Sequence, residues 1–254
     1  MACTSPAANL RYCSFVPCIE GDARDHAAYQ RALAGELADA LVTDPPYCLL
    51  TRRRKGGDFR DPKGVKIERG PVLRFESVRE YRAFTNAWLP LAVKHLVPSA
   101  PLAIWTNFLG KDPIRAAARD AGYRFEVAEY VWAKRTSEGG GNEILLRVYE
   151  TALIFAREPW PSPGPADPPR ALCVAAGYDD DGEATRWGSH PNHKPFGVLD
   201  PLLRQLTRPG QLILDPFAGS GSIAAAAVRL GRRAACIEIE AEWAERASRR
   251  LATG

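Results

Sequence analysis

The sequence predicts an α/β fold with a mostly parallel sheet, and three observations support this. Short apolar runs of strand length alternate with stretches of helical pattern along most of the chain. The 254 residues suit one large domain, and 46% hydrophobic residues are enough to fill its core. Because alternating strands and helices pack as a parallel sheet with helices on both faces, we expect a single three-layered domain.

The predicted elements follow one another in a regular order. Strands are expected over residues 18–22, 40–43, 102–106, 124–134, 149–156, 212–214 and 234–239. Helices are expected from the end of the first strand to about residue 35, and over 77–96, 113–121, 222–230 and 242–251. Ser77 and Glu80 have the spacing of a capping box, and Pro113 suits a first helical turn. The glycine-rich residues 137–142 predict a β-hairpin connection between the fourth and fifth strands.

Two stretches do not fit the alternation and are predicted to be loops or insertions. Residues 48–76 are rich in Lys and Arg, and residues 158–189 are rich in proline, glycine and acidic side chains. The net charge of the whole chain is +4, which is too mild to indicate a nucleic-acid partner by itself.

Cysteine and histidine spacing argues against a metal site. The six cysteines contain no Cys-x-x-Cys pair, and His190 and His193 lack a visible third ligand. Free thiols suit a reducing compartment, and the sequence carries neither a signal peptide nor an apolar stretch long enough to cross a bilayer. We therefore expect a cytoplasmic protein with no metal and no membrane partner.

The tetrapeptide Asp44-Pro45-Pro46-Tyr47 follows the second predicted strand. The strand delivers a carboxylate to its carboxyl end, and the two prolines stiffen the backbone and leave its carbonyl groups unpaired. Such a rigid set of acceptors beside a flat ring is suited to holding an aromatic amine. An ordinary strand-ending turn is the alternative, since Asp-Pro is common in turns.

A second motif runs from Asp215 through Phe217, Gly219, Ser220 and Gly221 into a helix at Ser222. Its glycines allow a ligand to approach the backbone, and the helix start favours an anion. Ala224 stands where a dinucleotide fingerprint has its third glycine, which weakens that assignment without excluding it. Asp215 could hold an ammonium group, and Glu238, which ends the next strand, could accept ribose hydroxyls. Ammonium, carboxylate and ribose together describe S-adenosylmethionine better than NAD.

These two motifs together resemble the amino-methyltransferases of DNA, and their order, with the tetrapeptide first, resembles the permuted β group. The acidic turn at Asp22 is similar to the family's turn near the cofactor adenine, and the element His190-Pro191-Asn192-His193-Lys194-Pro195 to its His-Pro-x-x-Lys-Pro element. The segments 130–134 and 149–155 resemble its paired late strands. The resemblance implies a Rossmann-like domain with a seven-stranded sheet, a β-hairpin and a circularly permuted motif order.

The resemblance also implies a division of the chain. Residues 15–157 form the catalytic half, 158–189 a variable insertion that could recognise the target, and 190–251 the S-adenosylmethionine-binding half. The implied catalytic residues are Asp44, Pro45, Pro46 and Tyr47. The implied cofactor-binding residues are Asp22, His190, Lys194, Pro195, Asp215, Phe217, Gly219, Ser220, Gly221, Ser222 and Glu238.

The implied reaction is methylation of an exocyclic amine on a base flipped out of double-stranded DNA. Asp44 and the Pro45 carbonyl would accept the amine hydrogens while Tyr47 stacks on the base. Asp at the head of the tetrapeptide favours adenine N6 over cytosine N4 and argues against RNA or protein-glutamine targets, whose families prefer Asn there. A cofactor-sensing DNA-binding protein without turnover is a further alternative. Cys48 lacks the Pro-Cys context of the cytosine-C5 methyltransferases.

Two basic stretches are candidate DNA-contacting surfaces, because Lys and Arg can neutralise phosphates. They are Arg52, Arg53, Arg54 and Lys55 after the tetrapeptide, and Lys134 and Arg135 before the glycine-rich connection. A homodimer and a cognate restriction endonuclease are further partners that the family implies, in a bacterial, archaeal or phage setting.

Overall fold

The computed structural model describes residues 18–50, 73–133, 149–160, 173–176, 182–187, 190 and 193–253. Along the chain the elements are β1 (Ile19–Glu20), α1 (His26–Leu33), β2 (Ala40–Thr43), α2 (Val78–Val93), β3 (Leu102–Thr106), η1 (Phe108–Gly110), α3 (Lys111–Asp120), β4 (Phe125–Ala133), β5 (Tyr149–Ala156), β6 (Cys173–Ala176), α4 (Glu183–Trp187), α5 (Phe196–Leu206), β7 (Leu212–Asp215), α6 (Ser222–Arg229), β8 (Arg233–Glu238) and α7 (Ala241–Thr253).

The strands form one sheet in the order β1-β8-β7-β2-β3-β5-β4-β6. Neighbouring strands are parallel except at β5, which runs antiparallel to both β3 and β4. The predicted mostly parallel α/β sheet is therefore confirmed. An eighth strand joins the seven expected ones because β6, which lies in the 158–189 stretch, pairs with β4 at the edge.

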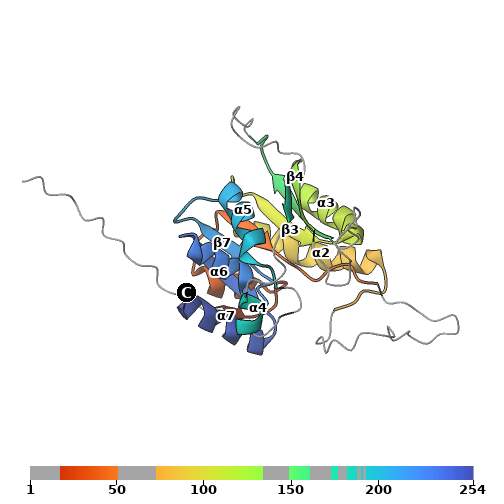
Figure 1. Cartoon of the computed structure of the whole chain (residues 1–254). Helices are drawn as coiled ribbons and strands as arrows, with labels where there is room; N and C mark the ends of the chain where they lie inside the picture. The colour runs from red at the N-terminus through yellow and green to blue at the C-terminus, as the bar shows by residue number, and fades with distance from the viewer. Residues whose placement is uncertain are drawn as a thin grey trace, which may run out of the picture.

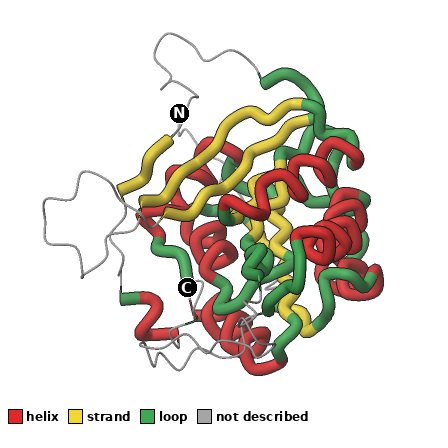
Figure 2. Tube along the Cα trace, turned by 90° about the vertical axis from the view of Figure 1, so that its right-hand side faces the viewer, coloured by secondary structure: helices red, strands yellow, loops and turns green. Residues whose placement is uncertain are grey.

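Helices cover both faces of this sheet, as Figure 1 shows for α2 and α3 on one side and α5 and α6 on the other. The central strands are apolar on both faces because helices bury both faces. Alternate residues of a strand point in opposite directions and so contact different helical layers. Leu41 and Ile104 pack with α1, α2 and α3, whereas Val42 and Trp105 pack with α5 and α6. A third cluster joins α6 to α7. In Figure 2 the tube shows the strands running between these two helical layers.

The loops that follow β2, β3, β7 and β8 all leave the sheet on the same side, at the carboxyl ends of these strands. The carboxyl ends of β2, β3, β7 and β8 lie there because these strands are parallel, and the amino end of β5 joins them because β5 is reversed. Chain order diverges between β2 and β7, since β2 continues through α2 and β7 through α6 on the opposite face. Ligands of open α/β sheets bind at such a divergence point.

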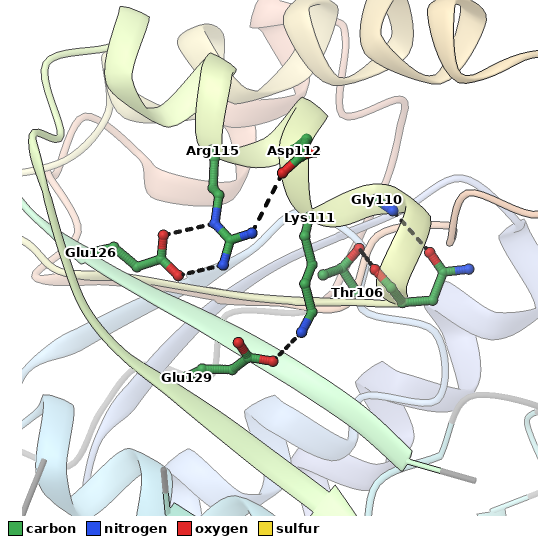
Figure 3. Close-up of polar contacts among 8 residues, drawn as sticks. Thr106, Gly110, Lys111, Asp112, Arg115, Glu126 and Glu129 are labelled. Atoms are coloured by element: carbon green, nitrogen blue, oxygen red, sulfur yellow. Dashed lines mark hydrogen bonds and ion pairs between the residues drawn. The ribbon is translucent and has the colours of Figure 1, made fainter. Parts of the chain in front are cut away.

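Local signals explain several boundaries. The Ser77 hydroxyl caps α2 by accepting from the Glu80 amide at 3.2 Å. The Glu80 carboxylate closes the predicted box one residue early, on the amide of Glu76. Helix α3 begins two residues before Pro113, directly after the turn in which the Asn107 side chain accepts from Gly110 N. Figure 3 shows this turn and the ion pairs that join α3 to β4.

None of the described helices is long and apolar enough to cross a membrane. The basic residues 52–55 and the pair Lys134 and Arg135, predicted to contact DNA, lie outside the described residues.

Candidate active site

Asp44 lies at the centre of a buried charge cluster at the carboxyl edge of the sheet. Its Oδ2 accepts from the Lys194 ammonium at 2.7 Å. The same ammonium donates to Glu150 Oε2 at 2.8 Å, and the Tyr47 hydroxyl donates to that oxygen at 2.7 Å. The Lys194 side chain is 1% exposed, that of Asp44 is 7% exposed and that of Glu150 is 13% exposed. We name these four residues, Asp44, Tyr47, Glu150 and Lys194, the charge cluster.

Burial and charge pull in different directions within the charge cluster. Burial raises the pKa of Asp44, as does the nearby charge of Glu150, while Lys194 opposes both. Burial alone would lower the pKa of Lys194, but the two carboxylates outweigh it and the pKa rises. Lys194 therefore stays protonated. Its ammonium also lies 4.6 Å from the ring centre of Trp105, within the range of a cation–π contact.

Asp44 keeps one oxygen without a protein partner. Its Oδ1 is buried and makes no hydrogen bond, although Oδ2 is engaged by Lys194. An unpaired buried carboxylate oxygen is costly, so such atoms usually await a ligand or serve catalysis. Asp44 lines a pocket, which makes its unpaired oxygen a candidate acceptor for a ligand.

A second buried carboxylate lines the same pocket from β7. Asp215 Oδ1 accepts from the Thr43 hydroxyl at 2.7 Å and from the Phe217 amide at 3.2 Å, whereas its Oδ2 is buried with no partner. Burial raises the pKa of Asp215 to about 7. Thr43 was not among the predicted site residues, although its place at the end of the strand that leads to Asp44 makes the contact natural.

The turn at residues 219–221, which we name the glycine loop, forms the next wall of the pocket. Gly219 has φ +50° and Gly221 φ +73°, both in the left-handed region that favours glycine. A Cβ at Gly219 would lie 2.7 Å from the His190 ring, so the loop passes closer to that ring than any side chain allows. Burial lowers the pKa of His190 to about 4, which keeps its ring neutral.

Most of the predicted cofactor residues meet at this pocket. Those that line it are His190, Lys194, Asp215, Phe217, Gly219, Ser220 and Ser222. Ser220 adds a third buried oxygen without a partner. Gly221 caps α6, and Pro195 precedes α5. The structure thus brings the tetrapeptide and the glycine loop together, as the resemblance implied.

Two predicted acidic residues are not part of the pocket lining. Glu238 accepts from the Gly219 amide at 2.7 Å and from the Glu240 amide at 2.9 Å, so it supports the glycine loop. Asp22 follows β1, next to β8, and its carboxylate is held by the Arg24 guanidinium at 2.6 Å. Both still offer second lone pairs to a ligand.

Sequence reasoning missed Glu150, the single carboxylate of β5. An acidic residue inside an otherwise apolar strand was the available signal, but its contact with Tyr47 depends on the reversed direction of β5. Among the described residues, no group of three or more His, Cys, Asp or Glu side chains could hold a metal ion.

Comparisons with known proteins show which family the chain belongs to. A family model described as DNA methylase, of the N6/N4 methyltransferase type, matches residues 38–249. A protein of Escherichia coli (strain K12) that is named only provisionally, as the methylase YubD, is 29% identical over 222 residues, covering 86% of this chain and 83% of its own. The Type II methyltransferase M2.DpnII of Streptococcus pneumoniae is 27% identical over 238 residues, covering 85% and 83%.

Solved structures share the fold. The complex of M1.HpyAVI with S-adenosylmethionine superposes with a TM-score of 0.64 at 19% identity, covering 92% of this chain and 98% of that one. The cytosine-N4-specific PvuII DNA methyltransferase superposes with a TM-score of 0.63 at 17% identity, covering 91% and 84%. The matched family model spans most of the chain, including both motifs of the pocket. The chain therefore belongs to the N6/N4 family of DNA methylases, the amino-methyltransferases that its motifs resemble.

Proposed function

We propose that this protein transfers a methyl group from S-adenosylmethionine to the exocyclic N6 amine of an adenine flipped out of duplex DNA, at a specific site. The observation that carries the proposal is the pair of unpartnered buried oxygens, Asp44 Oδ1 and Asp215 Oδ2, on residues that line one pocket. One acceptor suits the target amine and the other the ammonium group of the cofactor.

The residues of the pocket fit this cofactor. Asp215 Oδ2 would accept from its ammonium group, Gly219 and Gly221 leave room for it beside the backbone, and Glu238 at the adjacent strand end would accept ribose hydroxyls. His190 and Phe217 supply ring walls. When bound, S-adenosylmethionine supplies a methyl group on a positively charged sulfur, which is a good leaving group.

Asp44 then prepares the amine. The lone pair of the target amine is delocalised into the base ring, so the amine nitrogen is a poor nucleophile. Asp44 Oδ1 and the Pro45 carbonyl each accept one N–H, which draws the nitrogen toward tetrahedral geometry and localises the lone pair. The acceptors are already in place before the base arrives, and Lys194 holds the carboxylate from its other oxygen.

Tyr47 fixes the plane of the base by stacking, and its hydroxyl is anchored on Glu150. As the methyl group transfers, positive charge develops on the amine nitrogen, and the Asp44 carboxylate stabilises it. The nitrogen afterwards loses one proton, and Asp44, whose pKa is raised by burial, is the nearest base. No covalent enzyme intermediate is required.

Cytosine N4 is the second candidate target. The similarity in fold to the cytosine-N4-specific PvuII enzyme supports it. Asp44 at the head of the tetrapeptide is the feature that favours adenine. A homodimer and a restriction endonuclease partner stay predictions.

Identification of the modified nucleoside tests the proposal. The protein is incubated with isotope-labelled S-adenosylmethionine and plasmid DNA, and the digested nucleosides are separated by mass spectrometry. We expect labelled N6-methyladenine. Labelled N4-methylcytosine would select the second candidate, and the absence of any methylated nucleoside, with the cofactor bound, would favour the DNA-binding protein without turnover.

A further inference from the structure

We propose that Glu150 is a positioning residue of the methyl transfer: it holds the Tyr47 ring and the Lys194 ammonium in the places from which they act on the base and on Asp44. This inference rests on the proposed function, since it assigns a further residue to the same reaction. Glu150 contributes no atom to the reacting groups and acts through its two neighbours.

The reversed strand brings Glu150 to the site. In register, Trp132 of β4 lies opposite Glu150, and Thr106 of β3 lies opposite Thr151. Because β5 alone runs antiparallel within the described sheet, its second residue lies at the edge where β2 and β3 end. A carboxylate from the start of β5 therefore reaches the tetrapeptide that follows β2.

One oxygen of Glu150 accepts hydrogen bonds from both Tyr47 and Lys194. Its Oε2 accepts from the Tyr47 hydroxyl at 2.7 Å and from Lys194 at 2.8 Å, while Lys194 and the Tyr47 oxygen are 3.4 Å apart. The Tyr47 ring is thus tethered at its far end as well as at its backbone. A ring held at both ends presents a fixed plane for stacking, which a ring free to turn does not.

The charges of the cluster are difficult to explain as a device for stability alone. A single carboxylate would already neutralise Lys194, and a second buried carboxylate beside that pair adds repulsion and desolvation. Buried polar arrangements that strain the fold in this way concentrate at functional sites. With Glu150 sharing the ammonium, Lys194 is held between two anchors.

Three variants test the role directly. Glu150→Gln keeps the shape but removes the charge, Tyr47→Phe removes only the hydroxyl, and the double variant measures their coupling. Glu129→Gln is the matched control, because Glu129 lies on the neighbouring strand and pairs with Lys111 outside the pocket (Figure 3). The readouts are kcat, KM for DNA and the dissociation constant for S-adenosylmethionine.

For Glu150→Gln we expect kcat to fall roughly 10- to 100-fold, as for a displaced positioning group. Cofactor affinity should change less than about twofold, since Glu150 does not line that part of the pocket. The loss in the double variant should be smaller than the product of the two single losses. Glu129→Gln should leave all three constants within about twofold of the wild type.

The pH profile gives a readout that a merely structural role would not move. The charged or titratable groups around Asp44 are Lys194, Glu150, Tyr47, Asp215 from β7 and Tyr81 from α2. Because Glu150 opposes the ionisation of Asp44, its replacement by Gln should shift the acid limb of kcat/KM to lower pH. If Glu150→Gln fails to fold, the Tyr47→Phe variant still decides, through a lower kcat at unchanged cofactor affinity.

Unchanged kcat and an unchanged pH profile in Glu150→Gln, or strictly multiplicative losses in the double variant, would overturn the inference. Failure of the proposed function has a different signature, since the wild-type protein would then methylate no nucleoside.

Discussion

Two ion-pair networks of this molecule are built around glutamates on hydrogen-bonded neighbouring strands, and they differ in burial. On β4, Glu126 receives both arms of Arg115 at 2.7 and 2.8 Å, and Glu129 pairs with Lys111 (Figure 3). The Arg115 and Glu126 side chains are 32% and 34% exposed. On β5, Glu150 joins a cluster whose central lysine is almost fully buried. We name the exposed part of the β4 set, which is Arg115 with Glu126 and Asp112, the surface network.

The difference concerns what each network can do. The surface network joins α3 to β4 in contact with water, where screening leaves an ion pair worth about 1 kcal/mol or less. The charge cluster removes three ionised groups from water, which costs several kcal/mol per ion before their attraction offsets it. Such an arrangement adds little net stability, so its contribution is to chemistry: it holds an acceptor oxygen ready.

Replacement of Lys194 by Met should have the largest effect on stability. The two carboxylates then share no cation, and breaking a buried ion pair costs about 3–5 kcal/mol in free energy of unfolding. Without Lys194, which opposes the rise, the folded pKa of Asp44 rises further, so the variant binds more protons when folded than when unfolded. Its deficit should be small near pH 4 and grow as the pH rises.

Chemical denaturation of the wild type and Lys194→Met at pH 5 and pH 8 checks this. A deficit at pH 8 clearly larger than at pH 5 is expected, together with loss of methylation. Equal stabilities of the two proteins at pH 8 would show that the cluster carries no such cost.

Replacement of Asp215 by Asn should weaken cofactor binding and stabilise the protein without bound cofactor. The folded pKa of about 7 lies above that of an unfolded aspartate, so ionisation of Asp215 lowers stability as the pH rises from about 4 to 7. The neutral amide avoids this loss. Conversely, only the ionised carboxylate attracts an ammonium group, so cofactor affinity in the wild type should fall as the pH drops below 7.

Calorimetric titration with S-adenosylmethionine between pH 6 and pH 8, with thermal melts at the same pH values, measures both effects. The wild type should lose affinity toward pH 6, whereas Asp215→Asn should bind weakly at every pH and melt higher than the wild type at pH 8. An affinity in Asp215→Asn equal to that of the wild type would remove Asp215 from the ammonium site.

Removal of Arg115 from the surface network should have the smallest effect. Arg115→Ala breaks the contacts with Glu126 and Asp112, all in reach of water, and should lower the free energy of unfolding by about 1 kcal/mol or less. Methylation should stay at the wild-type level. A denaturation curve and an activity assay suffice, and a loss comparable to that of Lys194→Met would erase the distinction between the two networks.

Much of the scaffold could be predicted because its signals are local. The strands β2, β3 and β5 have the predicted bounds, since each is a short apolar run between turn residues. Helix α5 was not predicted, because it follows the His-Pro element directly and contains Pro201, a residue that usually interrupts helices. Strand β6 and helix α4 lie in a proline- and glycine-rich stretch that gives no periodic signal.

The site was only partly predictable for a different reason. Asp44 and Asp215 lie where strands end, and a carboxylate at the end of a strand is a recognisable signal of a ligand site. Glu150 is the second residue of its strand. The predicted hairpin makes β4 and β5 antiparallel, but nothing in the sequence says that β5 also pairs with β3 and begins beside Tyr47. The pairing of Lys194 with Asp44 joins residues 150 positions apart and likewise depends on the assembled sheet.

In the proposed reaction, the free oxygen of Asp44 accepts a hydrogen bond from the target amine. The most direct test of this role measures methyl transfer to DNA and S-adenosylmethionine binding on the same preparations of the wild type and Asp44→Ala. We expect the variant to lose methylation while its cofactor affinity stays close to that of the wild type. Methylation by Asp44→Ala at the wild-type rate would contradict this role.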